Sequence, residues 1–339
     1  MQLHTCKTGS EKFLQRELAL YGLECIRSGC GYVVAKTGPR DDALPPDLCF
    51  AIHSASDVRE LTANSVNAQA NALCDAFWEF FQGEKIEKPW FFHVVADDND
   101  KSLSARVHAV RSEFRKRMRR KMSRVAKLAS DELPRANVPN RGLLAVFADY
   151  KTLFVGSKLR FGGQRRMRTH EDAPSRSFLK VEEAYGILGR EPTAGEAVVD
   201  LGAAPGGWSF SAAERGANVL AIDNGELTDG AARHARIQHL QEDAFLYRPE
   251  GHRPYDWLFC DLIENPYLVL EDILIPWINN RGCRRFVVNL KVGKKDPVEL
   301  LRKLRENSID SPIARCDLLR VRQLYHDREE ITCCGVLPA

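Results

Sequence analysis

The sequence has no apolar run long enough to cross a membrane, and its first residues lack the apolar core of a secretory signal. These two absences argue against a membrane protein and against a secreted one. The 339 residues, 44% hydrophobic and 28% charged, have the composition of a globular chain with room for two or three domains. We therefore expect a cytoplasmic protein with no membrane partner.

Cysteine is plentiful, with ten residues, but the patterns that give cysteine a function are missing. No C-x-x-C pair occurs, and no group of cysteines and histidines has the spacing of a zinc site. Several cysteines, such as Cys260 and Cys316, lie in apolar or mixed runs typical of strands. We expect reduced, buried thiols and no bound metal.

The chain also lacks a large net charge, since its formal value is only +3. The basic residues are concentrated locally instead. The segment from Arg111 to Lys127 holds nine Lys and Arg residues against one Glu, and a second basic stretch runs from Lys158 to Arg168. Local clusters of this kind attract a phosphate backbone.

The first basic segment has a helical period. Apolar residues recur three or four apart from Val107 to Leu128, which predicts one apolar stripe with basic side chains on the other faces. A solvated amphipathic helix is the plainest interpretation, and a calmodulin-like or membrane-binding helix has the same pattern. The concentration of positive charge favours a surface that faces an anion.

The first half of the chain has a mixed pattern of helices and strands. It predicts a helix over 11–21 with Ser10 as its N-cap, and strands over 31–36, 90–96 and 142–155. The composition becomes polar around 165–177, before a second clear helix that Ser175 or Ser177 would cap. We place the main domain boundary in this polar segment.

The second half alternates strands with helices. The strands are expected over 197–201, 218–222, 237–242, 256–260, 285–290 and 330–336, and helices after 206 and over 267–279 and 297–306. This alternation predicts a parallel, doubly wound α/β sheet. Ligands of such sheets bind beyond the carboxyl ends of the strands.

The loop after the first of these strands lacks the G-x-G-x-x-G spacing of dinucleotide folds, which argues against a dehydrogenase. Its sequence is D-x-G-x-x-P-G-G, from Asp200 to Gly207, and the next two strands end near Asp223 and Asp243. Acids at three successive strand ends fit a cationic ligand without phosphate, such as S-adenosylmethionine. We expect Asp223 to accept from ribose hydroxyls and Asp243 from an adenine amino group.

A second set of charged residues is expected at the same edge. Asp261 and Lys291 end the next two strands, Glu330 begins the last strand, and Lys180 lies on the helix before the first strand. Methylation of a ribose 2′-hydroxyl needs a base, and a lysine is a base only when neutral. We expect burial and the charge of Lys180 to lower the pKa of Lys291, with both carboxylates orienting the ammonium groups. Ordinary surface salt bridges are the alternative.

These segments together resemble the RlmM group of FtsJ-like enzymes, which methylate the ribose 2′-hydroxyl of a cytidine in large-subunit (23S) ribosomal RNA. The resemblance is carried by DAPSRSFLKVEEA (172–184), VDLGAAPGGWS (199–209), DNG (223–225), NLK (289–291) and QLYHDREEIT (323–332). It implies a Rossmann-like methyltransferase sheet over 169–339, mostly parallel with an antiparallel last strand. It also implies a ferredoxin-like region over 1–80 and a THUMP-like RNA-binding domain over 81–168.

The resemblance further implies the residues of the site. The family's catalytic K-D-K-E set corresponds to Lys180, Asp261, Lys291 and Glu330, with Lys291 as the base and Glu329 as the alternative for the last position. The residues expected to contact S-adenosyl-L-methionine are Ser177, Asp200, Gly202, Ala204, Pro205, Gly206, Gly207, Trp208, Asp223, Asp243 and Asp261. The side chains expected to face RNA are Arg115, Arg119, Arg120, Arg124, Arg165 and Arg166. Trp90, Phe91 and Phe92 are expected to pack in the core, with stacking on bases as the alternative, and the protein is expected to be a monomer.

Other functions stay open at this point. A nucleobase methyltransferase predicts an Asn/Asp-Pro-Pro-aromatic motif at the fourth strand, where the sequence from Asp261 is D-L-I-E. A cytosine-5 enzyme needs a strand-end cysteine nucleophile, and Cys260 is expected to face away from the site. A non-catalytic RNA-binding or ribosome assembly factor is a further interpretation, against which the intact set of lysines and acids argues.

Overall fold

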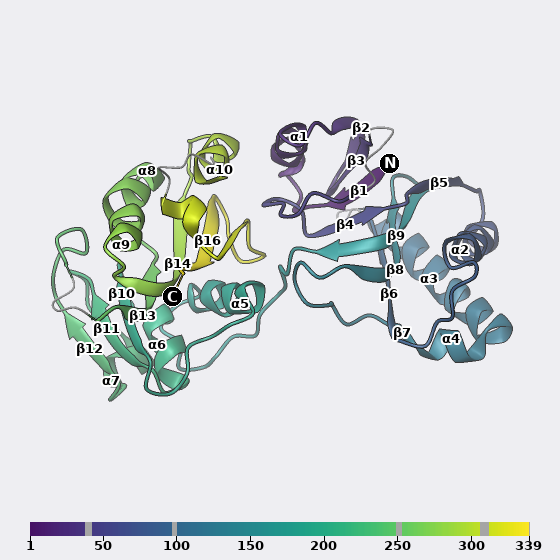
Figure 1. Ribbon diagram of the computed structural model, residues 1–339. Helices are drawn as coiled ribbons and strands as arrows, with labels where there is room; N and C mark the ends of the chain where they lie inside the picture. The colour runs from purple at the N-terminus through teal and green to yellow at the C-terminus, as the bar shows by residue number, and fades with distance from the viewer. Residues whose placement is uncertain (38–42, 97–99, 249–252, 306–311, 339) are drawn as a thin grey trace. The chain divides into compact units, whose positions relative to one another are not determined.

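The computed structural model describes residues 1–37, 43–96, 100–248, 253–305 and 312–338, and the chain divides into two compact units. The first unit is Met1–Gly163 and the second is Gln164–Ala339 (Figure 1). The boundary falls inside the basic stretch 158–168, so the two ends of that stretch belong to different units. The division of the first unit into two regions at residue 80 stays a prediction.

The first unit has an α+β architecture built on one nine-stranded sheet in the described residues. The strand order is β2-β3-β1-β4-β9-β8-β6-β7, and β5 pairs with β9. The strands are β1 (Gln2–Thr5), β2 (Glu24–Gly29), β3 (Tyr32–Lys36), β4 (His53–Ser56), β5 (Arg59–Thr62), β6 (Trp90–Val95), β7 (Ala129–Ser130), β8 (Asn140–Phe147) and β9 (Thr152–Phe161). The helices are α1 (Glu11–Ala19), α2 (Val66–Phe80), α3 (Lys101–Lys121) and α4 (Ser123–Lys127).

The apolar stripe of the basic segment packs as expected, but the helix is interrupted. Phe114 and Met118 of α3 are buried in a core that α3 shares with α2 and the sheet. The carboxylate of Asp100 caps the start of α3. At Met122 the backbone has a φ of −145°, which is not helical. The expected helix over 107–128 is therefore two helices, α3 and α4.

The aromatic residues of β6 lie in the core. Trp90, Phe91 and Phe92 are each at most 3% exposed, so they pack in the core and do not stack on bases. The indole N–H of Trp90 donates to the Val125 carbonyl of α4 at 2.9 Å, and its backbone N–H donates to the Leu128 carbonyl at 3.0 Å. These two bonds join α4 and the residue that follows it to β6.

The apolar run expected as one strand over 142–155 is a pair of strands. β8 and β9 are antiparallel, and the chain reverses between Phe147 and Thr152. The carboxylate of Asp149 fixes the reversal by accepting from the N–H groups of Lys151 and Thr152. Because apolar residues continue through both arms, the hydrophobic pattern does not mark this turn.

The second unit contains a seven-stranded sheet in the order β12-β11-β10-β13-β14-β16-β15. β12, β11, β10, β13 and β14 are parallel, and β16 is antiparallel to both of its neighbours. The strands are β10 (Ala197–Leu201), β11 (Asn218–Ile222), β12 (Ile237–Leu240), β13 (Tyr255–Cys260), β14 (Cys283–Lys291), β15 (Leu318–Arg322) and β16 (Glu330–Val336). The helices are α5 (Phe178–Leu188), α6 (Gly207–Glu214), α7 (Asp229–Arg233), α8 (Pro266–Leu268), α9 (Ile275–Asn279) and α10 (Pro297–Arg305). The expected Rossmann-like sheet with an antiparallel last strand is confirmed.

Figure 1 shows α5 and α6 on one face of this sheet and α8, α9 and α10 on the other. Tyr185 of α5 and Trp208 of α6 pack against Phe259 of β13 in the core of the first face. The parallel strands bring their carboxyl ends to one edge of the sheet. Because β16 runs in the opposite direction, its first residue, Glu330, lies at the same edge.

Some details of the second unit escape the sequence pattern. α7 and β15 are short elements that the pattern does not predict, and the expected helix over 267–279 contains a π-helix at Val269–Leu274.

Ser10 and Ser177 hold the N-cap positions of α1 and α5, but neither side chain makes the capping hydrogen bond. No helix in the described part of the chain has the length and apolarity that spanning a bilayer requires.

Candidate active site

The loop between β10 and α6, from Gly202 to Gly207, is packed tightly against its surroundings; we call it the glycine loop. Gly206 has a φ of 109°, a conformation that favours glycine, and a Cβ there would lie 2.4 Å from the Ala231 side chain. A Cβ at Gly207 would lie 2.7 Å from Ser177 Oγ. Both glycines are therefore required for the path of this loop. The same loop holds the expected residues Gly202, Ala204 and Pro205.

Asp200 lies beneath this loop. It is 1% exposed, and its Oδ2 accepts from the Ser209 hydroxyl of α6 at 2.7 Å, while its Oδ1 has no partner among the described residues. Burial raises the pKa of the Asp200 carboxyl to about 7, and the charges of Asp261 and Asp223 contribute to the rise. The fold thus places Asp200 in the core beneath the loop, and its contact with a cofactor stays a prediction.

The side chain of Trp208 is buried as well. It is 2% exposed, and its ring meets that of Phe259 edge-on with the centroids 5.9 Å apart. Its indole N–H donates to the Ser177 carbonyl at 2.9 Å. Trp208 therefore fixes α6 against the start of α5, and its contact with a cofactor stays a prediction. The Ser177 hydroxyl lies 2.6 Å from that of Ser175.

Two further acids lie at the carboxyl ends of β11 and β12. The carboxylate of Asp223 accepts from the N–H of Ala204 at 3.0 Å and from the N–H of Gly225 at 2.7 Å, which ties the glycine loop to β11. Asp243 is exposed and accepts from the N–H of Phe245 at 2.9 Å. Both carboxylates keep lone pairs for additional donors. This edge suits a ligand that offers hydroxyl, amino or ammonium groups and carries no phosphate.

Four charged side chains meet at the same edge; we call Lys180, Asp261, Lys291 and Glu330 the ion cluster. Lys291 Nζ contacts Asp261 Oδ1 and lies 3.4 Å from Glu330 Oε2, and Lys180 Nζ contacts Glu330 Oε1. The four side chains are between 11% and 21% exposed. Positive and negative groups alternate along the cluster, so each ammonium group has a carboxylate beside it.

The topology of the sheet assembles the ion cluster. Lys291 and Glu330 are register partners across β14 and β16, and Asp261 directly follows β13, the other neighbour of β14. Asn289 adds a contact that sequence reasoning missed, since its Nδ2 donates to Asp261 Oδ1 at 3.0 Å. The sequence does hold a sign of this contact. Asn289 lies two residues before Lys291, so both side chains are on the same face of β14.

The ion cluster raises the pKa of Lys291, whereas sequence reasoning expects it to be lowered. Burial alone lowers this pKa, but the carboxylates of Asp261 and Glu330 outweigh burial. The pKa of Glu330 falls below its ordinary value, because its contacts with Lys180 and Lys291 outweigh the opposite effect of burial. The expectation was wrong because Lys291 contacts Asp261 and lies close to Glu330, and these two carboxylates favour its charged form more than burial disfavours it.

The structure places Glu330, and not Glu329, beside the two lysines. Glu330 is the first residue of β16 and contacts Lys180 directly. The side chain of Glu329 is exposed, and its backbone carbonyl accepts from the N–H of Val292 at 2.8 Å. Adjacent side chains point to opposite sides of an extended chain, so only one of the two glutamates faces the cluster.

A buried carboxylate behind the ion cluster was not anticipated. Glu183 of α5 is 1% exposed, and its carboxylate accepts from the backbone N–H groups of Arg165, Tyr325 and His326 at 3.1, 2.7 and 3.2 Å. Glu183 and Lys180 are three residues apart on α5, so one helix positions both. Glu183 therefore holds the segment that leads into β16 and to Glu330.

The cysteines show no sign of a second chemistry. All ten are free thiols. Cys260 is fully buried, and burial raises the pKa of its thiol to about 12, which argues against a thiolate nucleophile. Within the described ranges, no three His, Cys, Asp or Glu side chains are placed to hold a metal ion.

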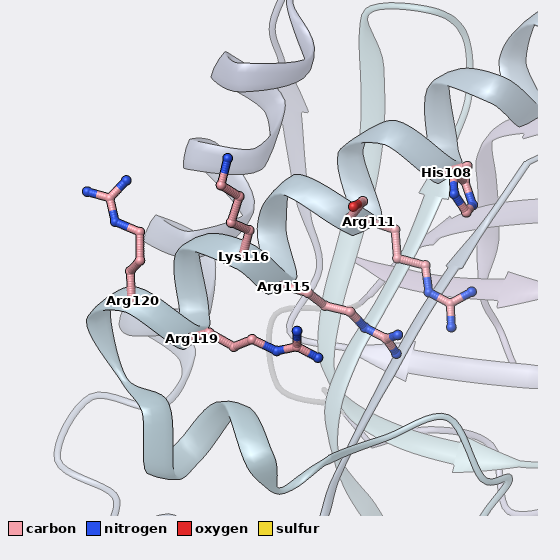
Figure 2. Close-up of a pocket in the computed structure, with 7 residues that line it drawn as sticks. His108, Arg111, Arg115, Lys116, Arg119 and Arg120 are labelled. Atoms are coloured by element: carbon pink, nitrogen blue, oxygen red, sulfur yellow. The ribbon is translucent and has the colours of Figure 1, made fainter.

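Most of the arginines expected to face RNA lie along α3 and α4 of the first unit. A pocket of about 680 Å³ lies along α3. It is lined by His108, Arg111, Ser112, Arg115, Lys116, Arg119 and Arg120 (Figure 2). Arg115 contacts the carboxylate of Asp131 at 2.6 Å, whereas Arg119 and Arg120 are exposed. Arg124 of α4 is 76% exposed and lies 3.7 Å from Glu87. The expected residues Arg165 and Arg166 belong to the second unit.

The glycine loop, the acids of β11 and β12 and two of the four residues of the ion cluster fall in one segment that has a known counterpart. Residues 173–274 match a family model described as FtsJ-like methyltransferase. This match covers Lys180, the loop, Asp223 and Asp261. Fold and site thus define a methyltransferase of the FtsJ-like class.

Full-length relatives define the family. The ribosomal RNA large subunit methyltransferase M of Halorhodospira halophila is 33% identical over 340 residues, which are 96% of this chain and 94% of the relative. The protein of that name from Aeromonas hydrophila is 35% identical over 357 residues, with the same coverages of 96% and 94%. That from Azoarcus is 42% identical over 178 residues, 50% of this chain and 48% of the relative. The chain belongs to the ribosomal RNA large subunit methyltransferase M family.

Proposed function

We propose that the protein transfers a methyl group from S-adenosylmethionine to a ribose 2′-hydroxyl of large-subunit ribosomal RNA, with Lys291 as the general base. The target nucleotide is a cytidine, as the resemblance to the RlmM group implies. The observation that carries the proposal is the ion cluster, which holds Lys291 between two carboxylates at the carboxyl edge of a methyltransferase sheet.

The residues at the edge fit this cofactor. S-adenosylmethionine supplies a methyl group activated by its sulfonium, and it carries hydroxyl, amino and ammonium donors but no phosphate. Asp223 accepts from its ribose hydroxyls, and Asp243 from its adenine amino group. The backbone from Ala204 to Gly207, the Ser177 hydroxyl and Asp261 complete the binding site. Asp200 and Trp208 act from the core, by holding α6 and its loop in place.

The ion cluster supplies the base for the reaction. Neutral Lys291 would take the proton of the 2′-hydroxyl while the hydroxyl oxygen bonds to the methyl carbon and the bond from that carbon to the cofactor's sulfur breaks, which leaves the sulfur as a neutral thioether. The proton then resides on Lys291 as an ammonium, which Asp261 and Glu330 stabilise. Lys180 balances the charge of Glu330 and keeps that carboxylate in position. The ammonium finally returns its proton to solvent.

The basic surface along α3 suits a role in holding the RNA. Arg119 and Arg120 are exposed on the pocket that Figure 2 shows, where they are available to phosphates. Contacts to phosphates position an RNA without reading its sequence. The choice of nucleotide therefore depends on the second unit and on the shape of the RNA.

The test is a direct analysis of the product. Purified protein and cofactor labelled in its methyl group are incubated with large-subunit ribosomal RNA from cells that lack the protein, and the RNA is digested to nucleosides for mass spectrometry. The expected product is 2′-O-methylcytidine at one position. Label on a base supports the nucleobase methyltransferase instead, and RNA binding without any transfer supports the non-catalytic alternative.

A further inference from the structure

The second unit has a pocket that adjoins the ion cluster. It has a volume of about 250 Å³ and is lined by Arg176, Ser177, Lys180, His326, Arg328 and Glu330. Lys180 and Glu330 belong to both the pocket and the cluster. Arg176 precedes α5, and Arg328 lies between β15 and β16, so two separate segments each contribute an arginine. Neither arginine is among the side chains expected to face RNA.

The pocket has more positive charge than its single acid balances. Glu330 already contacts both Lys180 and Lys291. The side chains of Arg176 and Arg328 are exposed, and in the described parts of the chain neither guanidinium has an ion pair or a hydrogen bond. His326 adds no charge, because its Nε2 accepts the N–H of Met167 at 2.9 Å, as only a neutral ring can.

We propose that Arg176 and Arg328 bind the phosphodiester on the 3′ side of the methylated ribose. This inference rests on the proposed function. In RNA the 3′-phosphate is bonded to the carbon next to the one that bears the 2′-hydroxyl, so a hydroxyl presented to Lys291 brings that phosphate with it. Guanidinium groups bind phosphate oxygens in pairs, which favours arginine for this contact.

The proposal has a consequence for the substrate. The enzyme recognises a ribose that continues into a 3′ phosphodiester, so it discriminates against a nucleoside and against a 3′-terminal ribose. The two arginines also fix which side of the ribose faces the pocket, because they line it together with Lys180 and Glu330, whereas Lys291 contacts Glu330 from outside that lining. Arg176 and Arg328 therefore orient the 2′-hydroxyl as well as adding affinity.

The test compares Arg176→Ala, Arg328→Ala and the double variant with Arg190→Ala. Arg190 is an exposed arginine two residues beyond the other end of α5, which makes it a matched control in the same unit. The substrates are two RNA fragments that contain the target nucleotide, one natural and one with an uncharged methylphosphonate as its 3′ linkage. Unfolding temperature and cofactor affinity are measured for every variant.

With natural RNA, the double variant is expected to lose at least about tenfold in kcat/KM, on the scale of a lost charge-assisted phosphate contact. Its cofactor affinity and unfolding temperature stay at the wild-type values, as does the activity of Arg190→Ala. The methylphosphonate costs the wild type a similar factor but costs the double variant little more, because the partner of the phosphate is already gone.

Three results would overturn the inference. In the first, the wild type methylates ribose and the double variant is equally active on natural RNA. This result would contradict the inference and leave the proposed function intact. Another is full additivity between the double substitution and the methylphosphonate. In the third, inorganic phosphate inhibits the wild type but not the double variant, while both proteins are equally active on RNA. That result would assign the pocket to a free anion. A wild type that methylates a base would contradict the proposed function as well.

Discussion

Lys291 and Glu330 face each other across the antiparallel strands β14 and β16, with the Lys291 ammonium 3.4 Å from a carboxylate oxygen of Glu330. The other oxygen of that carboxylate contacts Lys180, and Asp261 contacts Lys291 from β13. The arrangement fixes the position of the proposed base, but it also favours the protonated form of Lys291. The predictions about rate follow from this conflict between position and protonation.

The rate of methyl transfer is expected to increase with pH. Only neutral Lys291 accepts a proton, and its raised pKa keeps the neutral fraction small at neutral pH. Below that pKa the neutral fraction grows about tenfold for each pH unit. Glu330→Gln removes a carboxylate that raises the pKa of Lys291, so its rate profile is expected to shift to lower pH, whatever its maximal rate.

Single-turnover rates over a series of pH values check this shift. Glu329→Gln is the matched control, since Glu329 is exposed and lies next to Glu330 in the sequence, and its profile is expected to coincide with that of the wild type. A Glu330→Gln profile that is unshifted, or shifted to higher pH, would show that Glu330 does not set the protonation of the base.

The path of the glycine loop predicts a strong effect of Gly206→Ala. Alanine there adopts a φ of 109° only under strain, and its Cβ would lie 2.4 Å from Ala231. We expect a loss of about 1–3 kcal/mol in the free energy of unfolding. We also expect cofactor affinity to fall, because the loop must move to relieve the contact. Gly186→Ala is the control, since its Cβ would meet nothing within 4 Å. Denaturant unfolding and calorimetry with S-adenosylmethionine measure both effects, and wild-type behaviour of Gly206→Ala would refute the account of the loop.

Glu183→Gln is expected to lower the free energy of unfolding by about 3 kcal/mol, because a buried carboxylate that serves three backbone N–H groups is replaced by an amide with one acceptor oxygen. Methyl transfer should fall too, since the segment that Glu183 holds leads to Glu330. Glu171→Gln, at an exposed position, is expected to change neither quantity. Equal stability of the two variants in urea would mean that the buried carboxylate is not a structural anchor.

The raised pKa of Asp200 should make the free energy of unfolding depend on pH. Its pKa is about 7 in the folded protein, because of burial, and its ordinary value is 3.8. Between these values the folded state holds a proton that the unfolded state has lost, so this group's contribution to stability falls as pH rises. Relative to Asp200→Asn, which cannot ionise, the wild type is expected to lose about 3 kcal/mol between about pH 5 and pH 8. Urea unfolding of both proteins measures the difference, and a pH-independent difference would exclude the raised pKa.

The sequence predicts the second unit well because its strands are short, apolar and separated by clear turns. β10, β11 and β16 have the residue bounds that the pattern predicts. In the first unit, the turn at Asp149 and the break at Met122 escape prediction. The turn escapes because apolar residues continue through both of its arms. The segment after the break bonds to Trp90, which is distant in the sequence, and a local pattern does not contain such a contact.

The candidate site, too, has features that the sequence predicts and features that it does not. Strand ends identify Asp261 and Lys291, because a parallel sheet brings its carboxyl ends together. Glu330 begins the last strand and Lys180 lies on a helix, and the family resemblance adds these two residues to the set. The sequence does not reveal that Asp200 and Trp208 are buried or that Glu183 serves three N–H groups. It also gives the wrong direction for the pKa of Lys291, because that direction depends on how closely the carboxylates of Asp261 and Glu330 approach the ammonium. These properties belong to side-chain packing, and not to residue spacing.

The most direct test of the central claim is single-turnover methyl transfer to ribosomal RNA by Lys291→Ala, together with calorimetric titration of the same variant with S-adenosylmethionine. If Lys291 is the base, cofactor affinity stays at the wild-type value while the transfer rate falls by a factor of about 10²–10⁴, the usual contribution of a general base. A Lys291→Ala protein that methylates ribose at the wild-type rate would contradict the account.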